Sequence, residues 1–218
     1  MTRAGIIAVA VRIMRAEGLQ KATMRRLAQE LDTGPASLYV YVRNTAELPA
    51  AVLDELLGTV DLTPVSAAGD WRDRLATVLT SYTMVLFEHP GLARSALVAR
   101  PSGEYYLRLI ESLLDLLDRG GVLAGQADWG MDALLQYTTA TAAEHAHGER
   151  PADTRNDWDA LTNALHGVSG ATHPHIAALA PDLLAGEPQA RLSWGFRMLI
   201  NGIAHTPTPA PPDRSAHP

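Results

Sequence analysis

The sequence predicts an all-α protein, with a small helical head followed by a larger helical body and about nine to ten helices in total. Apolar residues recur at helical spacing along most of the 218 residues, whereas the alternating Val, Ile and Thr runs typical of strands are scarce. Gly and Pro fall between the periodic segments rather than inside them. These observations favour helices joined by turns over a fold that contains a sheet.

Four helices are predicted in the first 57 residues, and each has a recognisable boundary residue. The first ends at Gly18, the second is capped by Thr23, and the third begins with Pro35, a position where the missing N–H of proline costs nothing. The four helices are predicted at residues 3–17, 24–31, 35–42 and 45–57.

A loop of small residues at 59–69 separates this head from the body. The body helices end at turn signals such as His89-Pro90-Gly91 and Gly120-Gly121. Residues 147–172 give no clear pattern apart from a short helix indicated at 158–166, and the proline-rich tail at 206–218 is expected to be disordered. The remaining helices are predicted at residues 70–88, 92–99, 102–119, 126–145 and 188–205.

Charge is distributed unevenly along the chain. Residues 1–50 contain seven basic and four acidic side chains, a net charge of +3, whereas the whole chain carries −6, which leaves −9 for the rest. A basic head on an acidic body indicates a module that binds a polyanion, attached to a part with another task.

The composition limits the class of protein. Its 47% hydrophobic and 19% charged residues are ordinary for a soluble globular protein. The absence of cysteine excludes disulfide scaffolds, Cys-ligated zinc, iron–sulfur clusters and thiol catalysis. No apolar run approaches the roughly 18 residues of a membrane span, and Arg12 and Arg15 interrupt the apolar run at 6–11, so no signal peptide is expected. We therefore expect a cytoplasmic protein.

Residues 24–31 and 35–42 are predicted to form a helix-turn-helix. Two steeply crossing helices need a small residue on the first and an aliphatic one on the second where they touch, and Ala28 and Leu38 supply these. The exposed face of the second helix is small at its tip and aromatic further on, which suits a helix that enters the major groove of DNA. A three-helix structural bundle with incidental arginines is the alternative interpretation.

The sequence TMRRLAQEL at 23–31, followed by PASLYVYVRN at 35–44, resembles the tetracycline-repressor (TetR) family of bacterial regulators. The segment AEGL at 16–19 matches the same pattern, so the resemblance is specific over about residues 3–57 and diffuse beyond. It implies a helix-turn-helix DNA-binding domain at 1–45 and a helical ligand-binding and dimerisation domain at 46–205. It further implies a homodimer that binds a palindromic double-stranded operator and is released by a small hydrophobic or aromatic inducer, with no cofactor and no membrane partner.

The resemblance also assigns DNA contacts to positions in the head. Arg25 matches a residue that can pair bidentately with guanine, and the tip of the recognition helix matches residues that approach the groove. The chain departs from the family at Asp32, where many relatives have glycine and Gly34 is expected to supply the flexibility, and at Thr45, where lysine is common. The DNA-binding residues expected from this resemblance are Arg25, Arg26, Pro35, Ala36, Ser37, Tyr39, Tyr41, Arg43 and Thr45.

Aromatic residues at helical spacing in the body indicate a ligand pocket. The chain has six Tyr and four Trp but only two Phe, and aromatic side chains with a polar group suit a pocket for a planar ligand, whereas a dry core would do as well with Phe. Core packing is the alternative for each residue. The predicted ligand-binding residues are Tyr82, Leu86, Tyr106, Ile110, Trp129 and Tyr137.

Small residues on two helices predict a dimer face. Gly195 and Gly202 lie seven residues apart, hence on one side of the last helix, and each costs about 1 kcal/mol of helix stability relative to alanine, which close approach of a partner helix would offset. The helix at 126–145 has a similar small face, so two helices from each subunit would form a four-helix interface. Packing within one chain is the alternative. The predicted interface residues are Thr138, Ala142, Gly195, Leu199 and Gly202.

No motif of an enzyme is complete. The segment GVSGA at 167–171 has its second glycine misplaced for a nucleophile elbow and follows no strand. The pairs His145/His147 and His173/His175 have weak spacing for a metal site, because residues two apart on a helix point in different directions. We therefore expect neither an enzyme nor a metal site. The alternative function is a helical small-molecule-binding or enzymatic protein whose basic head contacts other proteins.

Overall fold

The computed structural model describes residues 1–42, 47–145 and 151–209, and its regular elements there are all helical, so the predicted all-α class is confirmed. The described residues form eleven α-helices and two short 3-10 helices. In chain order these are α1 (Arg3–Glu17), η1 (Leu19–Lys21), α2 (Met24–Glu30), α3 (Pro35–Leu38), α4 (Glu47–Leu57), η2 (Thr63–Ser66), α5 (Trp71–Glu88), α6 (Pro90–Ala96), α7 (Glu104–Arg119), α8 (Ala124–His145), α9 (Pro151–His166), α10 (Pro174–Leu184) and α11 (Pro188–His205).

Three parts of the helix prediction differ most from the structure. Helix α9 begins at Pro151 rather than at residue 158. The third helix ends at Leu38 rather than at residue 42, and turns continue the chain from there. Helix α10 was not predicted, because Pro174, Pro181 and Gly186 break the apolar pattern. Pro174 in fact opens the helix, since proline is tolerated in the first helical turn. Helix α10 alone accounts for the difference between the ten helices expected at most and the eleven described.

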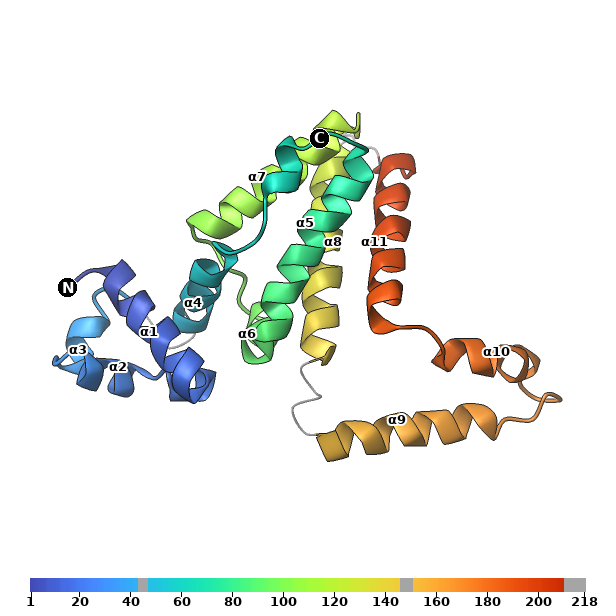
Figure 1. Ribbon diagram of the computed structural model, residues 1–218, viewed down its shortest axis with the longest axis horizontal. Helices are drawn as coiled ribbons and strands as arrows, with labels where there is room; N and C mark the ends of the chain where they lie inside the picture. Colours follow the sequence, from blue (N-terminus) through green and yellow to red (C-terminus); the bar gives the residue numbers. More distant parts are fainter. Residues whose placement is uncertain (43–46, 146–150, 210–218) are drawn as a thin grey trace, which may run out of the picture.

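The body is a bundle with α5 and α8 at its centre and α6, α7 and α11 packed against them (Figure 1). Leucine is the commonest residue of its interior, which includes Leu75, Leu79, Leu109, Leu113 and Leu134, all of them buried. Burying a leucine contributes about 1.5–3 kcal/mol relative to leaving it exposed, so this interior stabilises the bundle. Among the described residues, no helix combines the length and apolarity needed to cross a bilayer.

Helix α4 joins the head to the body. It packs on α1 within the head and, on other sides, on α6 and α7 of the body. Its side chains Leu48, Val52, Leu53 and Leu56 are buried and belong to one continuous hydrophobic core. Movement of α4 therefore affects both parts of the molecule.

Helices α9 and α10 pack on each other and extend away from the bundle as an arm (Figure 1). Residues 206–209, the start of the predicted tail, follow α11 without helix, and the carbonyl of Thr206 accepts a hydrogen bond from Gln126 Nε2 at 2.8 Å. The rest of the tail, 210–218, lies outside the described residues.

Candidate functional site

The head has the geometry of a helix-turn-helix. Thr23 caps α2 as predicted, because its hydroxyl accepts a hydrogen bond from the backbone N–H of Arg26 at 3.2 Å. Ala28 and Leu38 are both buried where α2 meets α3. The amide of Thr33 donates to the carbonyl of Ala28 at 2.9 Å, which fixes the turn between the two helices.

The turn itself corrects the prediction for Gly34. Gly34 has an ordinary φ of −79°, whereas Asp32 has a φ of 49°, in the left-handed region that favours glycine. Asp is tolerated there better than most residues because its short polar side chain can hydrogen-bond locally. Asp32 therefore provides the left-handed turn that glycine provides in many relatives.

The tip of α3 is open to solvent. Pro35, Ala36 and Ser37 are exposed, and Val40, just beyond the helix, is 80% exposed although it is apolar. Tyr39 is exposed as well, whereas Tyr41 is half-buried against the core of the head. The face that the sequence predicts for DNA is thus free, apart from Tyr41, whose ring also has a packing role. Arg43 and Thr45, predicted as DNA contacts, lie outside the described residues.

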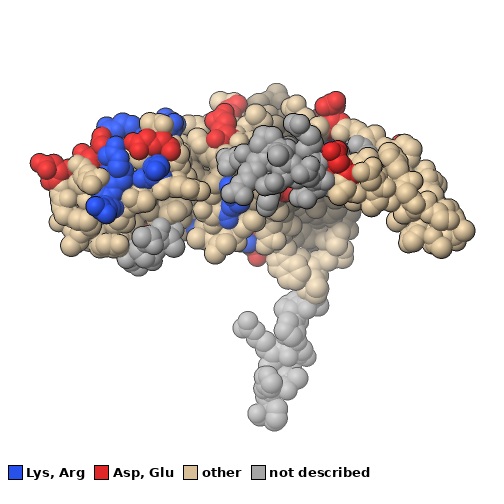
Figure 2. Space-filling model, turned by 90° about the horizontal axis from the view of Figure 1, so that it is seen from below, with Lys and Arg blue, Asp and Glu red and all other residues tan. Residues whose placement is uncertain are grey.

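The two arginines at the start of α2 have different surroundings. Arg25 is exposed, and it makes no hydrogen bond or ion pair with the part of the chain that the structure describes. Arg26 donates to Glu30 Oε2 at 2.6 Å and to Glu17 Oε1 at 3.0 Å, and Arg12 donates to the other oxygen of Glu30 at 2.8 Å. Figure 2 shows basic and acidic side chains interleaved over the head.

These ion pairs connect α1 to α2. The hydrogen bond from Arg26 holds the pKa of Glu30 below its ordinary value, and the bonds to Glu30 and Glu17 raise the pKa of Arg26. The guanidinium of Arg26 is therefore already engaged inside the head, which favours a structural role for it over the DNA contact that we predicted from the sequence.

A cavity of about 250 Å³ lies in the body between α5, the segment that leads from α6 to α7, and α8. It brings together two of the predicted ligand residues, Tyr82 and Tyr106. The full lining consists of Tyr82, Ala96, Leu97, Arg100, Pro101, Tyr106, Leu135, Gln136, Thr139 and Ala140.

The polar groups of this cavity fall into a buried pair and an exposed rim. The hydroxyls of Tyr82 and Thr139 are 3.0 Å apart and share one hydrogen bond. Burial raises the pKa of Tyr82 to about 12 and also raises the pKa of Tyr106, so both phenols keep their protons at neutral pH. At the rim, Asp132 accepts hydrogen bonds from Arg100 and, at 2.9 Å, from Gln136 Nε2.

The other four predicted ligand residues lie elsewhere. Leu86 is buried in the core and Ile110 packs against the core without lining the cavity. Trp129 is 60% exposed on α8. Tyr137 packs edge-to-face on Phe196 of α11, with ring centroids 5.8 Å apart. Arg100, Gln136 and Thr139 were not predicted from the sequence. Asp132, Gln136 and Thr139 are nevertheless spaced along one face of a helix, and this spacing groups them.

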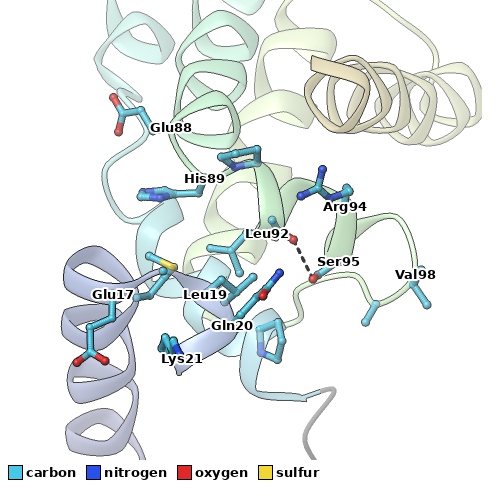
Figure 3. Close-up of a pocket in the computed structure, with 16 residues that line it drawn as sticks. Glu17, Leu19, Gln20, Lys21, Glu88, His89, Leu92, Arg94, Ser95 and Val98 are labelled. Atoms are coloured by element: carbon cyan, nitrogen blue, oxygen red, sulfur yellow. Dashed lines mark hydrogen bonds between the residues drawn. The ribbon is translucent and has the colours of Figure 1, made fainter. Parts of the chain in front are cut away.

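A second, larger groove of about 820 Å³ separates the head from the body. Figure 3 shows Leu19 of η1 and Leu92 of α6 pointing toward each other across it, with the His89 imidazole nearby. The contact is close at Gly91, where an added Cβ would lie 3.1 Å from Leu19 Cδ2. The hydroxyl of Ser95 donates to the carbonyl of Gly91 at 3.0 Å and holds this turn of α6 in place.

His89, which lines the groove, is expected to make the stability of the fold depend on pH. Burial lowers the pKa of His89, the negative charge of Glu88 opposes this with a smaller effect, and the positive charge of Arg15, the smallest of the three effects, lowers the pKa again. In the unfolded chain His89 binds a proton near pH 6.5, whereas in the folded chain it binds one only at lower pH. The free energy of unfolding is therefore expected to fall as the pH drops below about 6.5. His89→Asn, which can still precede α6 as a capping residue, should remove this loss.

Urea unfolding at pH values between 7.5 and 5 measures the effect. The carboxyl groups of Glu30 and Asp61 have lowered pKa values, so their contribution to stability is lost only below about pH 4.5. This loss lies outside the pH range of the measurement. An identical fall in the stabilities of the wild type and His89→Asn between pH 6.5 and 5 would assign the effect to another group.

The predicted dimer residues divide into buried and exposed ones. Thr138 and Ala142 are fully buried in their own chain, and Gly195 leaves room for the Tyr137 hydroxyl, which an added Cβ would overlap. Packing within the chain, the alternative left open by the sequence, therefore explains these three positions. Leu199 is half-buried, and Gly202 is exposed with open space around it.

An exposed apolar stripe lies beside Gly202 on α11. Trp194 is 67% exposed and Met198 is 47% exposed, and the spacing of four residues from Trp194 to Met198 to Gly202 places all three on one face of the helix. Among the described residues, no group of three or more His, Asp or Glu side chains comes together as a metal site.

Comparison with known proteins identifies the family. Residues 6–52 match the family described as bacterial regulatory proteins, tetR family, and residues 63–206 match the tetracyclin repressor-like C-terminal domain. The transcription regulator SCO7704 from Streptomyces is 60% identical, with a TM-score of 0.83 over 97% of this chain and 98% of that chain.

Two further relatives agree over nearly the whole length. ActR from Streptomyces coelicolor is 31% identical, with a TM-score of 0.81 over 94% of this chain and 95% of that chain, and it has been solved in complex with actinorhodin and with (S)-DNPA. The class C tetracycline repressor of Escherichia coli is 26% identical over 93% of this chain and 90% of that protein. The chain therefore belongs to the TetR family and is a DNA-binding transcriptional regulator rather than an enzyme.

Proposed function

We propose that this regulator is a cytoplasmic repressor whose head, residues 1–45, binds a palindromic operator and whose body, 46–205, releases it when a small molecule enters the 250 Å³ cavity. The observation that carries this proposal is the position of α4. It packs on α1 in the head and on α6 and α7, which adjoin the cavity. A ligand that changes the cavity wall can therefore change the angle at which the head is held.

The exposed residues of the head are the ones proposed to contact DNA. Pro35, Ala36 and Ser37 at the tip of α3 would approach the bases, with Tyr39 beside them, since this face is open in the structure. Arg25 would pair with a guanine at the edge of the same groove. Arg43 and Thr45 remain proposed phosphate contacts on the basis of the family resemblance.

Arg25→Ala is expected to lower operator affinity by about 1–3 kcal/mol and to relax specificity at one base pair in each half-site. Arg26→Ala should instead weaken binding to every operator variant alike, because it removes ion pairs that hold α1 to α2. Titration of both variants against operators mutated one base pair at a time distinguishes the two outcomes. Uniform weakening by Arg25→Ala would mean that Arg25 contacts phosphate.

The cavity favours an uncharged ligand with acceptor oxygens. The Tyr82 and Thr139 hydroxyls share one hydrogen bond, which leaves one of their two protons free for a ligand. Tyr106 donates no hydrogen bond to the described residues, so its hydroxyl is a second donor. Arg100 and Gln136 are held by Asp132, so the rim adds no free positive charge. Because the volume is below the usual range for drug-sized molecules, we infer a small hydrophobic or aromatic ligand that carries at least one acceptor oxygen.

Tyr106→Phe is expected to weaken ligand binding about two- to tenfold and to leave operator affinity without ligand unchanged. It removes one donor, worth about 0.5–1.5 kcal/mol, and keeps the ring. A small uncharged aromatic ketone, which matches the volume and the free hydroxyl donors of the cavity, is the first molecule to titrate. Tyr105→Phe is the matched control, because Tyr105 is the neighbouring residue and does not line this cavity. Equal ligand affinities of Tyr106→Phe and the wild type would remove Tyr106 from the proposed site.

The regulator acts as a dimer, and we propose that the stripe formed by Trp194, Met198 and Gly202 on α11 lies in the dimer interface together with α8. Large exposed aromatic residues are typical of such interfaces, and Gly202 would let a partner helix approach closely. Leu199 would contribute from the edge of the stripe.

Selection of random-sequence DNA duplexes by the purified chain tests the proposed function. The account expects a palindromic sequence to be enriched, because a twofold-symmetric dimer contacts two equal half-sites. Recovery of no preferred duplex would contradict the proposal.

A further inference from the structure

The first turn of α7 is capped by a side chain from another helix. The residue that precedes α7, Gly103, has no side chain, so the first N–H groups of the helix lack the usual partner. Asp54 of α4 takes that place, because its Oδ1 accepts a hydrogen bond from the backbone N–H of Tyr106 at 2.9 Å. Tyr106 is the third residue of α7, and the N–H at this position is one that capping side chains commonly bind. A negative charge here also interacts favourably with the helix dipole.

Gly103 makes room for this contact. Its φ is −89°, which any residue adopts, so its backbone does not require glycine. An added Cβ would overlap the carboxylate of Asp54. Asp54 and Gly103 therefore act together: Asp54 supplies the cap, and Gly103 leaves the space for its carboxylate.

The capped residue belongs to the ligand cavity. The side chain of Tyr106 lines the cavity, while its backbone N–H is held by α4. Helix α4 in turn packs on α1 of the head. The hydrogen bond from Tyr106 to Asp54 is thus a direct polar connection between the cavity wall and the helix that supports the head.

We infer that Asp54 is a positioning residue for induction, which couples the cavity to the head by holding α4 to the first turn of α7. The inference rests on the proposed function and adds to it the residue through which the signal passes. Coupling between two sites is reciprocal, so operator binding at the head must also change the stability of the first turn of α7. This consequence can be measured without a known ligand.

The experiment compares amide hydrogen exchange at Leu107 and Arg108 with and without a duplex selected by the wild-type chain from random-sequence DNA. These amides have helical partners of their own, including Gly103 O for Leu107, so they report the turn rather than the cap alone. In the wild type we expect the duplex to slow their exchange by at least about fivefold, the lower end of typical allosteric coupling. In Asp54→Ala the change should fall below about twofold, because the connection is lost.

Three further variants separate coupling from folding. Asp54→Asn keeps an acceptor oxygen and should retain the wild-type response, and Glu55→Ala removes the exposed neighbouring carboxylate and should also retain it. Gly103→Ala should behave like Asp54→Ala, since it expels the carboxylate from the other side. The double variant should show no loss beyond that of Asp54→Ala, because the two changes break the same contact.

Two results would overturn the inference. If Asp54→Ala and Gly103→Ala keep the duplex-dependent slowing of the wild type, Asp54 only caps α7. If the wild type selects no duplex, the proposed function and this inference fail together, and that failure is visible before any variant is made.

Discussion

Ala36→Glu is expected to lower operator affinity by at least about 100-fold. Ala36 is exposed at the tip of α3, on the face proposed to enter the major groove, so a glutamate there would bring a negative charge next to phosphates. Like charges brought together at an interface cost several kcal/mol, and each 1.4 kcal/mol is about tenfold in affinity. Because the side chain points to solvent, the fold of the head should be unaffected.

Ala68→Glu is the matched control for this substitution. Ala68 is also exposed, and it lies in the loop before α5, outside the head. Fluorescence anisotropy with a labelled operator measures both variants, and circular dichroism checks their helix content. Wild-type affinity in Ala36→Glu would place the DNA contact on another surface.

Trp194→Arg is expected to dissociate the dimer and, as a consequence, to abolish tight operator binding. Aromatic residues buried at interfaces often contribute about 2 kcal/mol or more, and a twofold axis makes each residue count twice. The dimer dissociation constant should therefore rise by about 1,000-fold. Trp194 is exposed in the single chain, so the monomer should stay folded.

Leu107→Arg is the matched control, since Leu107 is an exposed apolar residue on α7 rather than on α11. Sedimentation velocity at micromolar concentration gives the oligomeric state of both variants. A dimer of Trp194→Arg with unchanged affinity would show that the exposed stripe on α11 is not the interface.

Local sequence signals predict the head well. Gly18, Thr23 and Pro35 mark helix boundaries through backbone chemistry that acts within a few residues, and the structure has helix ends at these residues. The pair Ala28 and Leu38 also follows from local geometry, because only three residues separate the two predicted helices. The prediction that Gly34 supplies the flexibility of the turn was wrong, because Asp32 has the left-handed φ instead. Glycine is favoured in that region but Asp is also tolerated, so the sequence alone does not decide between the two residues.

The cavity and the dimer face depend on contacts between distant segments, and here prediction was weaker. Helical spacing predicted both Tyr82 and Tyr137 as ligand-binding residues. Tyr82 lines the cavity, whereas Tyr137 packs on α11. A small residue such as Gly195 allows close approach but does not say whether the neighbour belongs to the same chain. The cap on α7 joins Asp54 to Tyr106, which are 52 positions apart, so no local sequence pattern predicts it.

A footprint of the wild-type chain on its selected duplex tests the central claim most directly. The account predicts two protected half-sites of equal sequence on one face of the DNA, with centres about 34–36 Å apart or a multiple of that distance. Protection should disappear in Ala36→Glu and persist in Ala68→Glu. Protection of a single half-site by a monomer, or equal protection by both variants, would contradict a dimeric regulator that reads DNA through α3.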